Sequence, residues 1–459
     1  RCREGGVPFR ATPLARRLVM YTAFPASTRG CSAAQTIGFA ALALVSTVLF
    51  FHGTSALASP VAATSTRVNT VPMMHGATGI SRRPSANAFS QAGRRPVLRR
   101  NAVEAPTMPA GTIVDDGMMT LTRFMIESAM KTRTEGQEDM VRLISSISVA
   151  CKRIAALVQT AGISGSTGLA EGGGAVNVQG EEQKKLDVMS NDLLKASLRS
   201  SGKLGVIASE EEDDPVVVDE LYSGEYVATF DPLDGSSNID AAISTGTIFG
   251  VFKAPEECLV GDTESLSIRE ENCLQATLQP GANLVAAGYC MYSSSTILVM
   301  TTGDGLNGFT LDPTIGEFVL THPNMQIPKR GKIYSMNEAN YFDWDPKLQG
   351  YIDNLKKGEG SSGAKYSSRY IGSMVGDVHR TLLYGGIFAY PADAKNTNGK
   401  LRLLYEAAPM SLIFEQAGGK SIVGPNKRVL DVIPEQVHQR VPVFIGSPED
   451  VDEVSAALA

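Results

Sequence analysis

From about residue 120 onward, hydrophobic residues alternate with polar ones at the spacings of helices and strands. Segments 121–132, 138–162 and 181–201 carry apolar residues every three or four positions, which predicts amphipathic helices. Short β-prone runs occupy 204–208 ("LGVIA") and 226–230 ("YVATF"), and β-rich runs alternate with helical ones beyond residue 281. This mixture predicts an α/β (α+β layered) fold, in which layers of helices alternate with mixed sheets.

Three regions follow from these patterns. We expect a leader over 1–105, an N-terminal α/β domain over 106–310 and a C-terminal α/β domain over 311–459. A glycine-rich segment, 164–180, interrupts the helical pattern of the second region. It is either a surface loop or a lid beside a site.

The leader differs from the rest of the chain in its charge. Residues 1–100 hold thirteen arginines, no lysine and one acidic residue, so the remainder carries about eighteen net negative charges. The net negative charge of the residues after the leader argues against nucleic-acid binding and favours a protein that binds cations.

Within the leader, two targeting signals follow each other. A 15-residue apolar run, 37–51, precedes small residues around Ala56 and Ala58, as in a cleaved signal peptide. The run is shorter than the roughly 20 residues that span a bilayer, although a retained membrane helix is the alternative. The acid-free, Ser- and Arg-rich stretch that follows has the composition of a transit peptide. We therefore expect import into the stroma of a complex plastid and no membrane segment in the mature form.

Carboxylates stand at the ends of the two early β-prone runs. Glu210 and Glu211 follow "LGVIA", and Asp231 and Asp234 follow "YVATF". If the two strands are neighbours that end at one edge, four carboxylates converge, and such a cluster needs cations. Oxygen ligands without His or Cys favour Mg²⁺ or Mn²⁺. The alternative is that these are solvated acids at strand ends.

The residues after the second pair favour phosphate chemistry. Gly235 permits a tight backbone, and the Ser-Ser-Asn that follows it is a typical helix start. Backbone N–H groups at a helix start beside a metal bind phosphate, so phosphoryl transfer is the leading reaction class.

Several longer motifs carry a family resemblance. The stretches "FDPLDGSSNID", "KIYSMNE", "RYIGSMVGDVHRTLLYGGIFAYP" and "GKLRLLYEAAPMSLIFEQAGG" resemble fructose-1,6-bisphosphatase of the plastid, redox-regulated type, over residues 118–457. The resemblance implies Mg²⁺-dependent hydrolysis of the 1-phosphate of fructose 1,6-bisphosphate, in the Calvin cycle or in plastid gluconeogenic carbon flow. Two alternatives are a sedoheptulose-1,7-bisphosphatase or bifunctional sugar bisphosphatase, and a homologue that binds sugar phosphate without hydrolysis.

The resemblance also implies roles for individual residues. It implies about two or three Mg²⁺ ions per subunit, held by Glu210, Glu211, Asp231, the Leu233 carbonyl, Asp234 and Glu406. The residues implied to activate the attacking water are Asp187, Glu211 and Glu181, where the family more often has an aspartate in place of Glu181. The residues implied to bind substrate are Asp234, Gly235, Ser236, Ser237, Asn337, Arg369, Tyr370, Tyr390 and Lys400.

Some of these residues have a plain structural alternative. Tyr370 and Tyr390 could be core aromatics, and Lys400 with Arg402 could form a solvated strand face. An anionic bisphosphate nevertheless needs cations at the end away from the metals. His379 is expected to pack within a helix and not to act as a base.

The cysteines outside the leader suggest regulation. There is no CxxC and no Cys/His cluster, so neither structural zinc nor a dense disulfide framework is indicated. Residues 254–277 resemble the regulatory insertion of plastid enzymes, which implies a disulfide between Cys258 and Cys273, although two free thiols are the alternative. Cys290 is expected in the core and Cys151 on a helix.

The resemblance finally implies partners. Arg369 would reach into the site of a neighbouring subunit, so a homotetramer is expected. Thioredoxin is the expected reductant of the cysteine pair, fructose 1,6-bisphosphate is the expected substrate, and no nucleic acid is expected.

Overall fold

The computed structural model describes residues 118–132, 136–170, 183–218, 224–255 and 274–459. The predicted leader, Glu181, Cys258 and Cys273 lie outside these residues. The described residues belong to one compact unit of the chain. Within them, no helix has both the length and the apolar character needed to cross a bilayer.

The larger of two main sheets has eight strands, and its strands β1 and β3 pair in parallel. Apart from that pair, each neighbouring pair in this sheet is antiparallel. In spatial order its strands are β2 (Val216–Val217), β1 (Leu204–Ser209), β3 (Tyr226–Asp234), β4 (Thr245–Lys253), β5 (Leu284–Tyr292), β6 (Thr296–Thr301), β7 (Asn307–Asp312) and β8 (Glu317–His322).

The second sheet has six strands and mixes parallel with antiparallel pairs. In spatial order they are β10 (Ser367–Ser368), β9 (Ile333–Ser335), β11 (Ile387–Tyr390), β16 (Val443–Gly446), β13 (Lys420–Gly424) and β14 (Lys427–Arg428). A separate antiparallel ribbon joins β12 (Leu401–Arg402) to β15 (Arg440–Val441).

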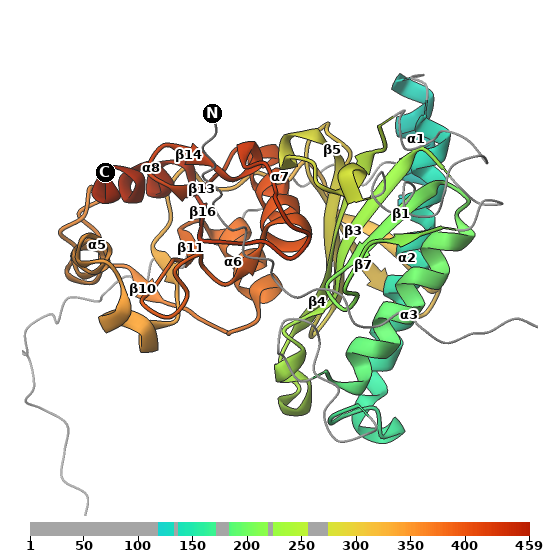
Figure 1. Cartoon of the computed structure of the whole chain (residues 1–459), viewed down its shortest axis with the longest axis horizontal. Coiled ribbons are helices and arrows are strands. Elements are labelled where there is room, and N and C mark those ends of the chain that lie inside the picture. The colour runs from blue at the N-terminus through green and yellow to red at the C-terminus, as the bar shows by residue number, and fades with distance from the viewer. Residues whose placement is uncertain (1–117, 133–135, 171–182, 219–223, 256–273) are drawn as a thin grey trace, which may run out of the picture. The chain divides into compact units, whose positions relative to one another are not determined.

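Helices occupy three layers around the sheets, as Figure 1 shows. One layer packs on the outer face of the eight-stranded sheet, a second lies between the sheets, and a third covers the far side of the six-stranded sheet. The outer layer is α1 (Leu121–Thr132), α2 (Gln137–Ser164) and α3 (Lys185–Ser200), the middle layer is α6 (Met374–Tyr384) and α7 (Ala408–Gln416), and the far layer is α5 (Pro346–Lys357) and α8 (Pro448–Leu458). This is the alternation of helical layers and mixed sheets that the sequence predicts.

Short helical turns complete the fold. The 3₁₀ turns are η2 (Ser236–Ala241), η4 (Gly281–Asn283), η5 (Glu338–Asp343) and η7 (Val429–Asp431), and η6 (Leu403–Ala407) is a π-helical turn that leads directly into α7.

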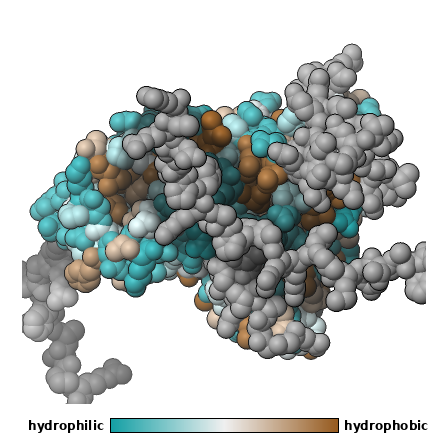
Figure 2. All heavy atoms as spheres, viewed as in Figure 1, coloured by the Kyte–Doolittle hydropathy of each residue, from teal (hydrophilic) through white to brown (hydrophobic). Residues whose placement is uncertain are grey.

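Burial explains the layering. Every residue of β3 is buried, as expected for a central strand with helices on both faces of its sheet. By contrast, α2 buries a single stripe that includes Leu143, Ile147 and Ile154, so it covers only one face of the sheet. On the face shown in Figure 2, hydrophilic residues cover much of the C-terminal half, with hydrophobic residues in smaller groups.

The structure corrects two local predictions. The strand that begins as "YVATF" continues through Asp234, so its acids lie within the strand and not after it. The segment after Gly235 is a six-residue 3₁₀ turn and not the start of an α-helix, and no side chain caps it. The domain boundaries at 105 and 310 stay predictions.

Candidate active site

The two acid-bearing strands are neighbours, as the sequence suggests. β1 and β3 run parallel, with Ser209 opposite Phe230, so Glu210 follows one strand where Asp231 stands on the other. The Glu210 N–H also donates to the Phe230 carbonyl at 3.2 Å. Both segments therefore bring their carboxylates to the same edge of the sheet.

A bulge in β3 turns two aspartates toward one face. Asp231 pairs with Ile248 and Asp234 with Gly246, so two residues of β3 stand opposite the single residue Thr247. In a regular strand, side chains three positions apart point to opposite faces, and one inserted residue cancels this difference. The Thr247 hydroxyl donates to the Pro232 carbonyl at 2.8 Å, so this backbone acceptor within the bulge has a hydrogen-bond partner.

A third acid approaches the two aspartates from the other half of the chain. Glu406 lies in the π-helical turn η6, and the carboxylate oxygens of Asp231, Asp234 and Glu406 lie within 4.8 Å of one another. All three residues are buried. Three like charges at this spacing strongly favour either protonation or a bound cation.

The pKa values reflect this crowding. Burial raises the pKa of Asp231 well above its ordinary value, and the charge of Glu210 adds to the shift. Burial raises the pKa of Asp234 to about 7, where the charge of Glu406 adds and the Val375 N–H opposes. These carboxyl groups offer only oxygen donors, and they do not readily ionise without a neighbouring positive charge. Such groups form a suitable site for a hard divalent cation.

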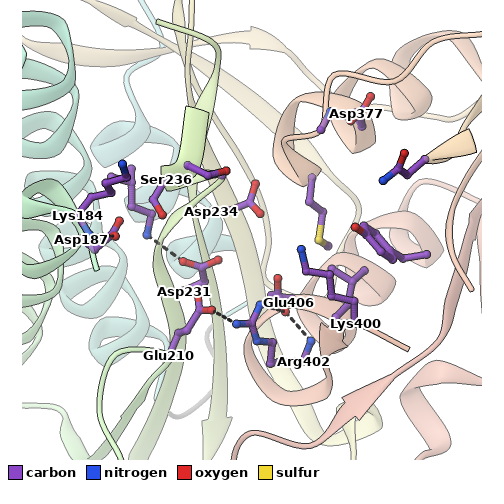
Figure 3. Close-up of a pocket in the computed structure, with 18 of the residues that line it drawn as sticks. Lys184, Asp187, Glu210, Asp231, Asp234, Ser236, Asp377, Lys400, Arg402 and Glu406 are labelled. Atoms are coloured by element: carbon purple, nitrogen blue, oxygen red, sulfur yellow. Dashed lines mark hydrogen bonds and ion pairs between the residues drawn. The ribbon is translucent and has the colours of Figure 1, made fainter. Parts of the chain in front are cut away.

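The remaining acids of this edge already have polar partners. A guanidinium nitrogen of Arg402, a residue that is 5% exposed, lies 2.6 Å from a Glu210 oxygen (Figure 3). The Gln183 amide donates to Glu211 at 2.5 Å. The Leu233 N–H donates to Asp231 at 2.9 Å, while Leu233 itself lines the same cavity.

Asp187 lies near the start of α3, across from the strand ends (Figure 3). One of its oxygens accepts the Lys184 N–H at 2.8 Å, so the residue also caps the helix. Its Oδ1 atom is buried and has no hydrogen-bond partner within the described residues. Burial raises the pKa of Asp187 to about 7, and the charge of Glu211 adds to the shift. A carboxyl with a free oxygen and this pKa is suited to accepting a proton near neutral pH.

Asp234 also fixes the middle helical layer. One of its oxygens accepts the Val375 N–H at 2.9 Å and lies 3.4 Å from the Ser373 hydroxyl, at the start of α6. Gly235 follows with φ of 76°, and a Cβ there would lie 2.7 Å from the Ser373 hydroxyl oxygen. Glycine is therefore required at this position both by backbone conformation and by space.

A single cavity of about 680 Å³ joins these acids to a cationic and aromatic end (Figure 3). The predicted site residues that line it are Asp187, Glu210, Glu211, Asp231, Leu233, Asp234, Gly235, Ser236, Ser237, Asn337, Tyr370, Tyr390, Lys400 and Glu406.

At the cationic end, Lys400 lies with its ammonium 5.6 Å from the centre of the Tyr390 ring. Tyr370 is half-buried, and burial raises its pKa, with a further contribution from Tyr390. Asn337 caps η5 through its side chain, which accepts the Ala339 N–H at 3.2 Å. The two tyrosines line the cavity, which argues against a purely structural role in the core.

Two comparisons with known proteins bear on this geometry. The family model for the N-terminal domain of fructose-1-6-bisphosphatase matches residues 119–323, and the model for the C-terminal domain matches residues 327–459. The chain belongs to the fructose-1,6-bisphosphatase family. Among the curated relatives, the chloroplastic fructose-1,6-bisphosphatase 1 of Arabidopsis thaliana is 59% identical over 345 residues, which cover 74% of this chain and 81% of the relative. The chloroplastic fructose-1,6-bisphosphatase of Oryza sativa subsp. japonica is 54% identical over 388 residues, covering 83% of this chain and 94% of the relative.

Solved structures agree with the family assignment. The crystal structure of Leishmania major fructose-1,6-bisphosphatase in holo form superposes with a TM-score of 0.68 at 46% identity. The match covers 74% of this chain and 99% of that one. The predicted family, layered fold and hydrolase class are thereby confirmed, and the relatives do not favour a sedoheptulose bisphosphatase.

Some predicted residues lie away from the fructose-1,6-bisphosphatase cavity. Arg369 is exposed, does not line the cavity and donates to the Ser368 carbonyl at 2.8 Å. Glu181 lies outside the described residues. His379 is buried and bonded to the Tyr289 hydroxyl at 2.8 Å, and burial lowers its pKa to about 4, as suits a packed residue. Cys151 and Cys290 are buried free thiols.

Sequence reasoning missed two parts of the site. Arg402 is an ion-pair partner of Glu210 and not a member of a solvated strand face. The buried Asp377 accepts the N–H groups of Ile371 at 2.9 Å and Gly372 at 2.9 Å, which holds the loop beside Tyr370. The signal for Arg402 was its place two residues after Lys400 and four before Glu406 in "GKLRLLYE". No pattern in the sequence marked Asp377.

Proposed function

We propose that this chain hydrolyses the 1-phosphate of fructose 1,6-bisphosphate and releases fructose 6-phosphate and inorganic phosphate. The observation that carries the proposal is the single cavity with clustered carboxylates at one end and Lys400 at the other. A bisphosphate has two anionic groups, so one end can bind through cations and the other through a basic side chain. The chloroplastic relatives support a plastid location and a role in plastid carbon flow.

The buried acids fit a divalent cation. Three carboxylates within 4.8 Å and the raised pKa values of Asp231 and Asp234 support this fit. We propose about two or three Mg²⁺ ions, or Mn²⁺ in their place. When bound, the ions would polarise the phosphoryl group, activate water and offset the charge of the leaving oxygen. The proposed donors are Glu210, Glu211, Asp231, the Leu233 carbonyl, Asp234 and Glu406.

Asp187 is the proposed proton acceptor. Its Oδ1 atom would take the proton of the attacking water, and Glu211 would orient that water, with Glu181 as a further acid. The buried position of Oδ1 and the pKa of about 7 support this role for Asp187.

Binding groups would hold the substrate across the cavity. The turn from Gly235 to Ser237 would bind the 1-phosphate through backbone N–H groups, while Asp234 would contact the sugar end of that phosphate. The 6-phosphate and sugar would be bound at the other end by Asn337, Tyr370, Tyr390 and Lys400, with Arg369 from a neighbouring subunit.

Phosphate release is the direct test. Purified chain without the leader, 106–459, is assayed with fructose 1,6-bisphosphate and sedoheptulose 1,7-bisphosphate side by side, with Mg²⁺ and with chelator. We expect Mg²⁺-dependent release with a higher kcat/KM for the fructose substrate. A higher kcat/KM for the sedoheptulose substrate would reverse the assignment, and calorimetric binding without turnover would indicate a non-enzymatic homologue.

The subunit arrangement needs a separate test, because Arg369 is exposed and does not line the cavity of its own subunit. We propose a homotetramer. Mixed oligomers of Arg369→Ala and Asp234→Asn subunits should regain activity, since some sites then combine an intact Asp234 with an intact Arg369 from the neighbour. No regain on mixing would place Arg369 in its own subunit's site or outside catalysis.

Redox control is proposed for a pair outside the described residues. Cys258 and Cys273 would form a disulfide that lowers activity, with thioredoxin as the reductant. Cys258→Ser should be active without dithiol, and Cys290→Ser is the matched control because its thiol is buried. Equal Mg²⁺ requirements of oxidised and reduced protein would rule out the switch.

A fluorescent fusion of residues 1–105 tests the proposed signal and transit peptides.

A further inference from the structure

A histidine outside the cavity connects the two segments that carry the candidate metal ligands. His438 lies between η7 and β15 and is half-buried. Its Nδ1 atom lies 2.8 Å from the Tyr405 hydroxyl, and its Nε2 atom lies 3.0 Å from the Glu212 carbonyl and 3.4 Å from that of Asp213. The Tyr405 and His438 rings also pack edge to face, with their centres 5.8 Å apart.

The partners define how His438 is protonated. A carbonyl oxygen only accepts hydrogen bonds, so Nε2 carries the proton and donates it toward Glu212 and Asp213. Nδ1 is then the acceptor, and the Tyr405 hydroxyl donates to it. The neutral imidazole thus bridges a side chain of η6 to the backbone of the loop after β1.

Each end of this bridge is one residue away from a candidate ligand. Glu212 follows Glu211, and Tyr405 precedes Glu406. His438 itself is held by the ribbon, because Arg440 pairs with Arg402 and the Leu403 N–H donates to the Gln439 carbonyl at 2.7 Å. The bridge therefore fixes the separation between acids from the two halves of the chain.

Other contacts to this loop do not replace the bridge. The Arg402–Glu210 ion pair also crosses between the halves, but it uses the carboxylate that a cation would need. Asn191 and Lys195 of α3 bind the Glu212 side chain, which ties the loop to the outer helical layer only. His438 bonds to backbone carbonyls, so cation binding leaves its contacts intact.

We propose that His438 is a positioning residue that holds the Glu210–Glu212 loop in register with Glu406 for divalent-cation binding. This inference rests on the proposed metal-dependent function. Removal of the imidazole should weaken cation affinity while leaving substrate affinity nearly unchanged, because His438 does not line the cavity that contains the proposed sugar-binding groups.

The test uses His438→Ala in the full mature chain, with Mn²⁺ as the probe. We expect about tenfold weaker Mn²⁺ binding by calorimetry or electron paramagnetic resonance, since one or two hydrogen bonds to the loop are lost. The Mg²⁺ concentration for half-maximal activity should rise by the same factor, with KM for fructose 1,6-bisphosphate within twofold. His322→Ala is the matched control, because His322 is also half-buried and bonds to the Thr321 hydroxyl on β8, away from the loop.

Rescue separates positioning from a general loss of structure. His438 lines a second cavity of about 770 Å³, which is large enough to admit free imidazole. Imidazole should restore most of the Mn²⁺ affinity of His438→Ala, and His438→Gln should keep part of it because its amide N–H can reach a carbonyl.

Three results would overturn the inference. These are unchanged Mn²⁺ affinity in folded His438→Ala, a rise in KM equal to the loss of metal affinity, and an equal effect of His322→Ala. If His438→Ala does not fold, the His438→Gln variant decides, and wild-type affinity there overturns the inference. Failure of the proposed function looks different: wild type would bind Mn²⁺ through this loop but release no phosphate.

Discussion

The two ends of the candidate catalytic cavity are built in different ways. The acidic end comes from β3, the end of β1 and η6, where Asp231, Asp234 and Glu406 are buried. At the cationic end, Lys400 is exposed and Tyr370 and Tyr390 are half-buried, in loops or at a strand end. Buried like charges raise the free energy of the folded protein, so the acidic end needs a rigid frame and a cation. The exposed end needs neither, and substrate can order it on binding.

The largest expected effect comes from a neutral substitution at the acidic end. Asp234→Asn removes a proposed cation ligand but keeps an oxygen that can accept the Val375 N–H. We expect kcat to fall on the order of 10³-fold, since cations contribute several kcal/mol to phosphoryl transfer. Thermal stability without metal should not fall, because one crowded charge is gone. The exposed Asp304→Asn is the control, and unchanged kcat at saturating Mg²⁺ would contradict the ligand role.

A substitution at the cationic end should affect binding instead. Lys400→Met removes the proposed phosphate contact, so KM for fructose 1,6-bisphosphate should rise roughly 10- to 100-fold, as expected for a charged hydrogen bond. At saturating substrate, the Mg²⁺ requirement should stay the same. Lys420→Met, an exposed lysine paired with Asp452, serves as the control. A changed Mg²⁺ requirement at saturating substrate would show that Lys400 also acts on the acidic end.

Protons should compete with cations at the acidic end only. Asp234, a proposed cation ligand, has a pKa raised to about 7, so below that pH a proton must leave before a cation binds. Apparent Mg²⁺ affinity should therefore rise by roughly tenfold between pH 6 and pH 8. Calorimetry in buffers of different ionisation enthalpy measures the released protons. Equal heats in all buffers would mean that the carboxyls are already ionised.

The stability of the metal-free protein should also depend on pH. A folded-state pKa near 7, against 3.8 for an ordinary aspartate, means that the folded state holds the proton more tightly. For these groups, stability is then greatest below pH 3.8 and is lost as the pH rises to 7. Thermal melts with chelator measure this slope. Asp234→Asn should reduce it, and an unchanged slope would assign it to other groups.

The sequence predicted the acidic end well because its signals are local. Asp231 and Asp234 flank a proline at the end of a β-prone run, and Glu210 follows another such run, so strand pairing brings them together. The bulge that turns both aspartates to one face depends on the partner strand, and no local pattern reveals it. Asp377 accepts backbone N–H groups five and six residues before it, and such bonds between a side chain and the backbone leave no periodic signal. The proposed reach of Arg369 into a neighbouring site involves a second subunit, so a single chain cannot test it.

Asp234 belongs both to the carboxylate cluster and to the contacts at the start of α6. One of its oxygens accepts the Val375 N–H at the start of α6, and Asp377 on the same helix holds the loop beside Tyr370. A cation bound at Asp234 and a sugar bound at Tyr370 would therefore both contact groups that are hydrogen-bonded to α6. Thermodynamic reciprocity requires that, if the cation strengthens sugar binding by some factor, the sugar strengthens cation binding by the same factor. The enzyme would then be half-saturated with Mg²⁺ at a concentration set by its substrate.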